Sequence, residues 1–318
     1  MRKAFKKLLI TAISFCAAGV LIFVIGMSVI GWDFYKLDTA EYTAKSYTPE
    51  AVVSSFELDV ESFPVIVKRG DAVSLDYYEA SDSVVSVETV NGVLKVRERQ
   101  SRNPFVNMFN IGRFKHKYVL TVVDGGDVSI SGGTISVTLD GLQASSLSID
   151  APNADVEINA CKFDSLRVKS SNLDASIFNS EIADVKIYDC LNVDLAMSGG
   201  SGRALAVEAT NLDAALANIN YDSMNFDGIN VDISANGVIA RSIKADGTNS
   251  DLELQSISAD IIELNSVNLT AEIVVNGRAA DYGIYGDGMD LPPSRPGATD
   301  KRITLTGVNN DVSLRFTA

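Results

Sequence analysis

Apolar and polar residues alternate along most of this chain, and from Val128 onward the alternation recurs every nineteen or twenty residues. Each repeat reads apolar-x-apolar, a short turn, Asn-x-Asp and a further alternating run. In one repeat, Leu166 and Val168 flank Arg167, Asn172 follows at the corner, and a second strand covers 173–177. A helix would need apolar positions three and four apart, which these runs lack. The pattern predicts an all-β fold, a parallel β-helix or solenoid with coils of about nineteen residues.

One asparagine occupies the same position in successive repeats, with Thr134 one period earlier. The row consists of Asn153, Asn172, Asn192, Asn211, Asn230, Asn249, Asn268 and, after an insertion, Asn309. We expect the stacked carboxamides to hydrogen-bond along the axis. We also expect a left-handed backbone at this corner, which Asn tolerates. These residues therefore form a structural ladder.

An aspartate follows two residues after six of these asparagines, at Asp155, Asp174, Asp194, Asp213, Asp232 and Asp251. Alternation turns all six outward. Neighbouring charges about 4.8 Å apart repel by roughly 0.9 kcal/mol in water. Three interpretations compete: a solvated face that blocks sideways association, a weak calcium or cationic-polymer face, and the paired catalytic carboxylates of a polysaccharide-cleaving enzyme. The row is regular and suggests no cleft. The Gly-rich nine-residue calcium repeat is absent, so we predict no cofactor and at most weak Ca²⁺ binding.

A charge-free run near the N-terminus, Leu8 to Ile30, has 23 residues and exceeds the roughly 20 that cross a bilayer. Four basic residues precede the run, and Trp32 follows it. We predict a cytoplasmic tail (1–7) and an uncleaved transmembrane helix (8–31) in the plasma membrane, with everything beyond it extracellular. A cleaved signal peptide is the main alternative, but its apolar core is usually shorter, and no Ala-x-Ala ends this run.

The remaining chain divides by pattern into a stalk (32–50), a β-rich cap region (51–123) and the solenoid (124–318) with an inserted loop (277–300). In the cap region, Asn91-Gly92 between two apolar runs is a strong hairpin signal. The solenoid should comprise nine or ten coils and measure about 45 Å, at ~4.8 Å per coil.

Two irregular segments interrupt these patterns. Arg97 to Lys117 mixes basic residues with Phe105, Phe109 and Phe114. It is interpreted as a loop that folds back as the cap that solenoid ends need, or alternatively as a contact for anionic lipid, polymer or a partner. The loop 277–300 is rich in Gly and Pro and is either a surface excursion or a partner-binding tip.

Composition excludes several function classes. The chain has 27 basic and 41 acidic residues, and without the four basic residues that precede the apolar run its net charge is −18. Such a surface disfavours nucleic acid, which needs clustered Lys and Arg. His116 is the only histidine, so a catalytic triad or zinc site is not expected. Cys161 and Cys190 occupy different positions of the repeat, which argues against a disulfide framework.

These features together resemble the bacterial putative-adhesin family of envelope proteins. The resemblance covers about residues 51–318. It rests on Tyr77-Tyr78-Glu79 and on the hairpin Asn91-Gly92-Val93-Leu94-Lys95-Val96, followed by short β-solenoid repeats. The family's function is largely unassigned. The resemblance implies a cell-surface role in adhesion or envelope stress and transfers no catalytic residue.

The sequence therefore predicts a membrane-anchored, non-catalytic binding or scaffold module outside the cell. Its partner would be an envelope polymer or a surface protein. One alternative is a component of an envelope-stress or signalling system that acts through a membrane partner. Another is a polysaccharide-acting β-helix enzyme, which would need clustered carboxylates beside a basic residue in a groove.

Overall fold

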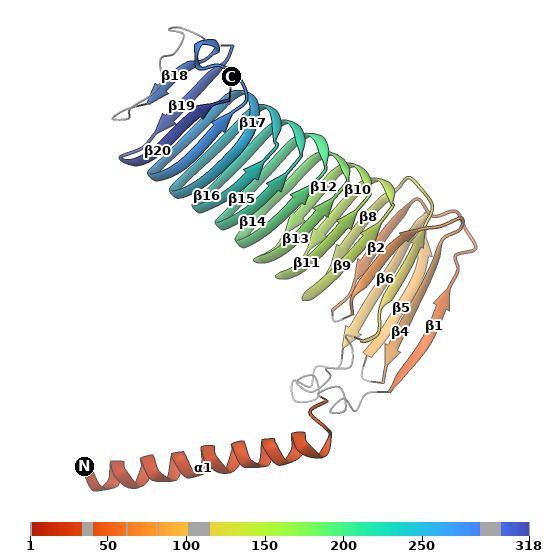
Figure 1. Cartoon of the computed structure of the whole chain (residues 1–318). Coiled ribbons are helices and arrows are strands. Elements are labelled where there is room, and N and C mark those ends of the chain that lie inside the picture. Colours follow the sequence, from red (N-terminus) through yellow and green to blue (C-terminus); the bar gives the residue numbers. More distant parts are fainter. Residues whose placement is uncertain are drawn as a thin grey trace.

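The computed structural model describes residues 2–33, 41–61, 63–81, 83–100, 115–286 and 300–317. It contains one long helix and a continuous stack of strands (Figure 1). The elements are α1 (Arg2–Val29), β1 (Tyr42–Tyr47), β2 (Ser55–Asp59), β3 (Val65–Arg69), β4 (Ser74–Ala80), β5 (Ser83–Val90), β6 (Val93–Gln100), β7 (Tyr118–Val122), β8 (Asp127–Ser131), β9 (Thr134–Asp140), β10 (Gln143–Asp150), β11 (Asn153–Asn159), β12 (Lys162–Lys169), β13 (Asn172–Phe178), β14 (Glu181–Ser198), β15 (Ser201–Ala217), β16 (Asn220–Asn236), β17 (Ile239–Val275), the 3-10 helix η3 (Ala279–Asp281), β18 (Gly283–Gly286), β19 (Arg302–Thr306) and β20 (Asn309–Phe316).

From β8 onward the chain forms a two-sided β-solenoid of about nine coils. β10 pairs in parallel with β8 and β12, and β11 pairs in parallel with β9 and β13. The longer strands β14 to β17 run around corners and contribute to both sides. We call the side of β8, β10 and β12 the first sheet. The second sheet consists of β9, β11, β13, the segments 192–198, 211–217, 230–236, 249–255 and 268–275, and β20. The predicted fold class is confirmed.

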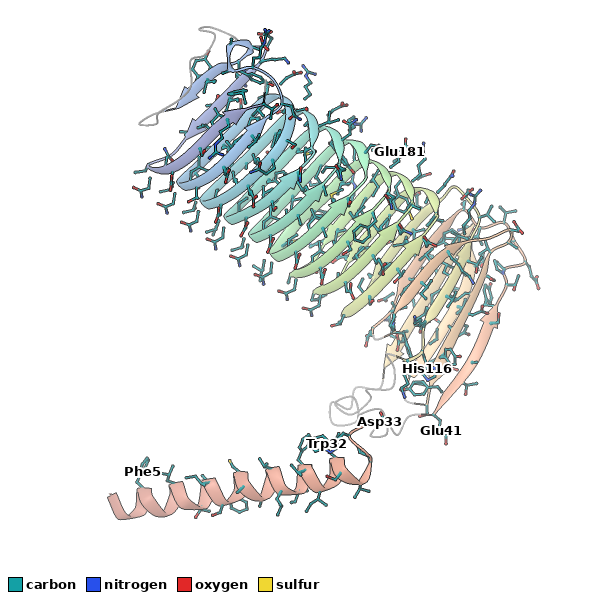
Figure 2. All side chains as sticks on the ribbon, viewed as in Figure 1. Phe5, Trp32, Asp33, Glu41, His116 and Glu181 are labelled. Carbon is teal, nitrogen blue, oxygen red and sulfur yellow. The ribbon has the colours of Figure 1, made fainter. Side chains whose placement is uncertain are left out.

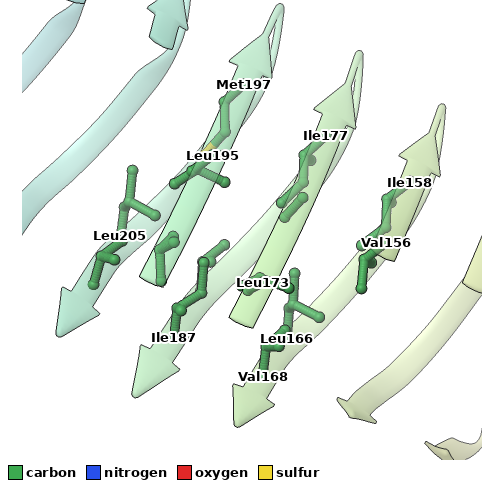
Figure 3. Close-up of a cluster of buried hydrophobic side chains, with 14 of the residues drawn as sticks. Val156, Ile158, Leu166, Val168, Leu173, Ile177, Ile187, Leu195, Met197 and Leu205 are labelled. Carbon is green, nitrogen blue, oxygen red and sulfur yellow. The ribbon is translucent and has the colours of Figure 1, made fainter. Parts of the chain in front are cut away.

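The core lies between the two sheets and follows the predicted alternation. Leu166 and Val168 from the first sheet meet Leu173 and Ile177 from the second, and all four are at most 4% exposed (Figure 3). Buried apolar side chains form one cluster that reaches from the cap region to β19. No coil could bury its apolar residues alone, so the stack should be stable only as a unit.

Left-handed backbone occurs at a different corner from the one expected. A column of residues with positive φ follows the second-sheet strands from β9 to the segment 249–255: Gly141, Ala160, Asn179, Gly199, Asn218, Gly237 and Ser256. All eight ladder asparagines are described, and none has positive φ. Each ladder asparagine lies within a strand, at the start of its second-sheet segment, and lacks positive φ, so the expectation of a left-handed ladder corner is wrong. In the left-handed column, Asn179 lies over Gly199, where an added Cβ would come within 2.7 Å of the Asn179 Oδ1.

The cap region adds two coils to the array, out of chain order. β2 pairs in parallel with β8, and β3 with β9, so β2 and β3 form the coil before them. β6 and β7 then pair in parallel with the other edges of β2 and β3. Antiparallel strands close this end: β5 on β6, β4 on β7 and β1 on β4. The β5–β6 turn is at Asn91 and Gly92, which have φ of 52° and 78°, so the hairpin signal is confirmed.

Polar and aromatic side-chain contacts add to the pairing of β1 with β4. Lys45 donates to Glu79, and the Val85 N–H donates to the same carboxylate at 3.1 Å. The ring of His116 lies between those of Tyr42 and Tyr78, with both centroid distances at 4.3 Å. His116 lies at the end of the array nearest the helix (Figure 2).

The last coil forms beyond the insertion as the sequence predicts. Ile303 of β19 stacks on Ile262, and Asn309 of β20 stacks on Asn268. Within the predicted loop 277–300, residues 287–299 lie outside the described part, whereas β18 pairs in parallel with β19. In the basic and aromatic segment 97–117, residues 101–114 also lie outside the described part.

Helix α1 contains a stretch, Thr11–Val29, with a mean hydropathy of 2.4 and only 6% of its residues buried. It is long and apolar enough to cross a membrane. By length and composition it fits either a membrane anchor or a signal sequence.

Candidate binding groove

The ladder asparagines form an unbroken chain of side-chain hydrogen bonds. Each Nδ2 donates to the Oδ1 of the preceding coil at 2.7–2.8 Å, from Asn172 on Asn153 to Asn309 on Asn268. Thr134 occupies the next place below Asn153. A primary amide has two N–H donors and an oxygen with two lone pairs. Each inner asparagine therefore keeps one donor and one acceptor position for another partner.

The six aspartates also stack in register, each one coil above the last. All six are exposed, and the strand spacing places neighbouring rungs about 4.8 Å apart. The stacking of the aspartates follows from sequence alone, because each Asp lies two residues after a ladder Asn. The column continues at Thr270 and ends at Asp311.

The two sheets carry different charge. The second-sheet strands from β9 to residue 275 contain no Lys or Arg, whereas they contain ten acidic residues: Asp140, Asp155, Glu157, Asp174, Asp194, Asp213, Asp232, Asp251, Glu253 and Glu272. On the first sheet, acids pair with bases, as in Lys162–Glu181 at 2.9 Å and the Arg203 guanidinium on Asp184. Negative charge is therefore compensated on one sheet and largely uncompensated on the other.

The pKa values of two aspartates in the row reflect this environment. Partial burial, followed by the charges of Asp194 and Asp155, raises the pKa of Asp174. Partial burial and the charges of Asp213 and Asp251 likewise raise the pKa of Asp232. Both causes disfavour the ionised form, and a bound cation would offset the repulsion between the neighbouring carboxylates.

The Asn and Asp rows border a long groove of about 1100 Å³. Its floor is the residue between each Asn and Asp, such as Leu173, Leu212 or Val231. Phe63 and Pro64 line one end, and Thr270 lines the other. The groove spans nine coils, which is roughly 38 Å at ~4.8 Å per coil. The expectation that the row has no cleft is wrong, because two projecting rows of side chains enclose the strip between them.

A smaller hollow of about 300 Å³ lies on the first sheet, lined by Lys162, Glu181, Arg203 and Asp222 among others. Glu181 projects from the surface of the array in Figure 2. This is the combination of carboxylates and bases that the enzyme alternative requires. The Lys162–Glu181 and Arg203–Asp184 pairs satisfy most of these charges internally. Within the described residues, no group of three or more His, Cys, Asp or Glu side chains could hold a metal ion.

Two buried thiols and one buried hydroxyl in the described part of the chain have raised pKa values, which disfavours their ionised, reactive forms. Burial raises the pKa of both Cys161 and Cys190, and each thiol donates to a backbone carbonyl two residues earlier. Both cysteines are free. Burial also raises the pKa of Tyr221, whose hydroxyl lies in the core.

Sequence reasoning identified both rows but not the ends of the groove. Phe63 and Pro64 belong to the corner between β2 and β3, which joins the array only because β3 pairs with β9. No periodicity links that corner to the repeats. Asp311 could have been assigned to the Asp row, since it follows Asn309 by two residues.

A β-solenoid with an acidic groove along one side is thus the class of structure that fold and site define. The chain belongs to the Toastrack DUF4097 family, whose sequence profile matches residues 53–211, half of the chain. No curated protein matches the chain.

Several solved structures are similar at low identity. One is a putative cell adhesion protein from Clostridium sporogenes. It is 7% identical, the match covers 88% of this chain and 100% of that chain, and the TM-score is 0.27. A putative adhesin from Bacteroides fragilis has 12% identity, coverage of 71% and 96%, and a TM-score of 0.26. A putative lipid binding protein from Parabacteroides distasonis has 11% identity, coverage of 88% and 98%, and a TM-score of 0.30. TM-scores this low support no structural argument.

Proposed function

We propose that this protein is a membrane-anchored, non-catalytic binding module displayed outside the cell, and that its groove binds an extended cationic polymer. The observation that carries the proposal is the groove of about 1100 Å³ bordered by the Asp row, on second-sheet strands that contain no Lys or Arg from β9 to residue 275. A long groove with repeated rungs suits a repeating ligand, since six successive coils offer the same Asn and Asp pair.

The anchor is helix α1. Its charge-free run follows Arg2, Lys3, Lys6 and Lys7, which favours a cytoplasmic N-terminus by the positive-inside rule. The stalk and the array then lie outside. The run is longer than the apolar core of most signal peptides, which supports retention over cleavage.

Charge and hydrogen-bonding capacity define the ligand class. Several carboxylates along one groove attract a cationic chain, and their like-charge repulsion falls when it binds. The remaining N–H of each ladder asparagine can donate to hydroxyl or carbonyl oxygens of the same chain. A lysine-rich segment or an amino-sugar polymer offers both kinds of group.

Calcium is the competing ligand. Calcium takes oxygen ligands at about 2.3–2.6 Å, so one ion can lie between carboxylates of adjacent rungs. Such a site would gain only two carboxylates from the protein, and high-affinity sites use six to eight oxygens. We therefore expect weak calcium binding and no resident cofactor.

The test is calorimetric titration of fragment 33–318 with a lysine oligomer and a glucosamine oligomer. The variant carries Asp213→Asn and Asp232→Asn, and the control carries Asp164→Asn, which removes an exposed charge on the first sheet. We expect at least tenfold weaker binding in the double variant, little change in the control, and weakening by salt. Equal loss in variant and control, or no binding of either oligomer, would refute the proposal.

A calcium arm uses the same proteins. We expect millimolar calcium to raise the Tm of the unaltered fragment slightly and to compete with the oligomers. A rise that persists unchanged in the double variant would place the calcium site elsewhere.

A further inference from the structure

The end of the array farthest from the helix has a step. β18 pairs with the outer edge of β19, so the first sheet extends one strand beyond that coil. The second sheet ends at β20, which pairs only with β17 among the described residues. One strand position beside β20, level with β18, is therefore open in the described structure.

The open edge combines available backbone groups with uncovered apolar side chains. The Thr317 N–H donates to the Val275 carbonyl. Because backbone direction alternates along a strand, the N–H groups of residues 312, 314 and 316 point to the open edge. The same positions carry Val312, Leu314 and Phe316, which are only partly buried. Their counterparts one coil earlier, at 271, 273 and 275, are at most 3% exposed.

We infer that two copies of this protein join end to end across a twofold axis, with β18 of each copy pairing antiparallel with β20 of the other. Within a coil, the two sheets run in opposite directions. A twofold axis parallel to the strands places the first sheet of one copy in line with the second sheet of the other. The adjoining strands of the two copies are then antiparallel. The projecting β18 of one copy then enters the open position of its partner, and the reverse contact forms by symmetry. The contact is isologous and closes at two copies.

Strand register identifies residues that should face one another. Tyr285 lies over Thr304, and Thr304 lies over Glu263, three residues before the corner at 266–267. Asp311 lies over Thr270, three residues after that corner. Both residues are therefore equally distant from the corner. The twofold rotation places Tyr285 of one copy opposite Asp311 of the other, and both point outward.

The charges at this end permit close approach. Its described residues include four basic and three acidic side chains: Arg278, Lys301, Arg302, Arg315, Asp281, Asp300 and Asp311. The long side of the second sheet is acidic, so sideways association would bring like charges together. The opposite end carries β1, the first strand after α1 in the chain. With α1 anchored as proposed above, the end-to-end dimer would connect two membranes.

Cross-linking of the full chain in nanodiscs, one copy per disc, tests this geometry. A Cys16→Ser background leaves only the buried Cys161 and Cys190. Discs with Tyr285→Cys are mixed with discs carrying Asp311→Cys or Ser313→Cys and then oxidised. We expect disulfide-linked pairs in the mixture with Asp311→Cys, fewer with Ser313→Cys, and none in any single preparation. Linking of Asp311→Cys or Ser313→Cys discs among themselves would indicate pairing of β20 with β20 and would overturn the inference.

A backbone variant gives a second, independent measurement. Val312→Pro removes an N–H that points to the open edge, a position where edge strands tolerate proline. Val312→Ala keeps the N–H and is the matched control, and thermal melting of both variants verifies folding. By mass photometry, we expect at least tenfold fewer paired discs for Val312→Pro than for Val312→Ala. Equal pairing of the two variants, or no pairing of unaltered discs at any concentration together with no cross-linking, would refute the dimer.

Discussion

Asn211→Ala measures what the asparagine ladder contributes to stability. Asn211 donates to Asn192 at 2.8 Å and accepts from Asn230 at 2.7 Å, so the substitution removes two hydrogen bonds. A hydrogen bond contributes a net ~0.5–1.5 kcal/mol. Asn192 and Asn230, which lose their partner, are exposed and can bind water. The contribution of each lost hydrogen bond should therefore lie in the lower half of that range. We expect a loss of about 1–2 kcal/mol in the free energy of unfolding.

Urea denaturation of fragment 33–318, followed by circular dichroism, is the assay. Asn309→Ala removes one ladder bond instead of two, so its loss should be about half as large. Asp213→Ala on the same strand removes an exposed charge without breaking the ladder, and it should be neutral or slightly stabilising. If Asn211→Ala costs no more than Asp213→Ala, the ladder contributes nothing to stability and the reasoning fails.

Three further predictions concern packing and charge. Gly202→Ala should lower the free energy of unfolding by about 1–3 kcal/mol, because the added Cβ would come within 2.0 Å of a carbonyl oxygen of the preceding coil. Gly133→Ala should be tolerated, because the nearest atom to its Cβ would be 3.9 Å away. Equal Tm values for the two variants would contradict this reasoning. Tyr221→Phe should leave the Tm unchanged or raise it, since it removes a buried hydroxyl that has no hydrogen-bond partner among the described residues. A clear fall in the Tm would contradict this, because it would mean that the hydroxyl makes a stabilising hydrogen bond. The raised pKa values of Asp174 and Asp232 mean that the folded state binds protons more readily than the unfolded chain. Their unfavourable contribution is complete above the folded pKa and disappears as the pH falls through it towards about 3.9. Replacing both with Asn should therefore raise the Tm more at pH 7 than at pH 4, and an equal effect at both values would refute the assigned cause.

The repeats were predictable because each coil obeys the same local rules. Alternation assigns Leu166 and Val168 to the core and Arg167 to solvent, and the spacing of the asparagines gives the register of every rung. The same spacing located the resumption of the array at Ile303. Such information is local and recurs, so a single sequence is sufficient to recover it.

Two features could not be recovered in this way. The coil of β2 and β3 lies between the coils of β6–β7 and β8–β9, which follow one another directly in sequence. Only the pairing of β2 and β3 with strands of both coils reveals this insertion. The left-handed column consists of Gly, Ala, Asn and Ser residues, so it lacks the single residue type that made the ladder visible. The groove depends on how far neighbouring rows project, which a pattern of buried and exposed positions does not specify.

The attachment of β1 has a mechanical consequence. Among the described strands, β1 lies at an edge, and its four central residues are exposed. Besides its pairing with β4, it is held by the contacts of Lys45 with Glu79 and of Ser46 with Asp76. Strands cross the array axis, so tension between the helix and the far end would load the β1–β4 hydrogen bonds one after another. β1 should peel away first and lengthen the tether by about 20 Å, at ~3.3 Å per residue. The coils would stay folded while this extensible joint absorbs the initial pull.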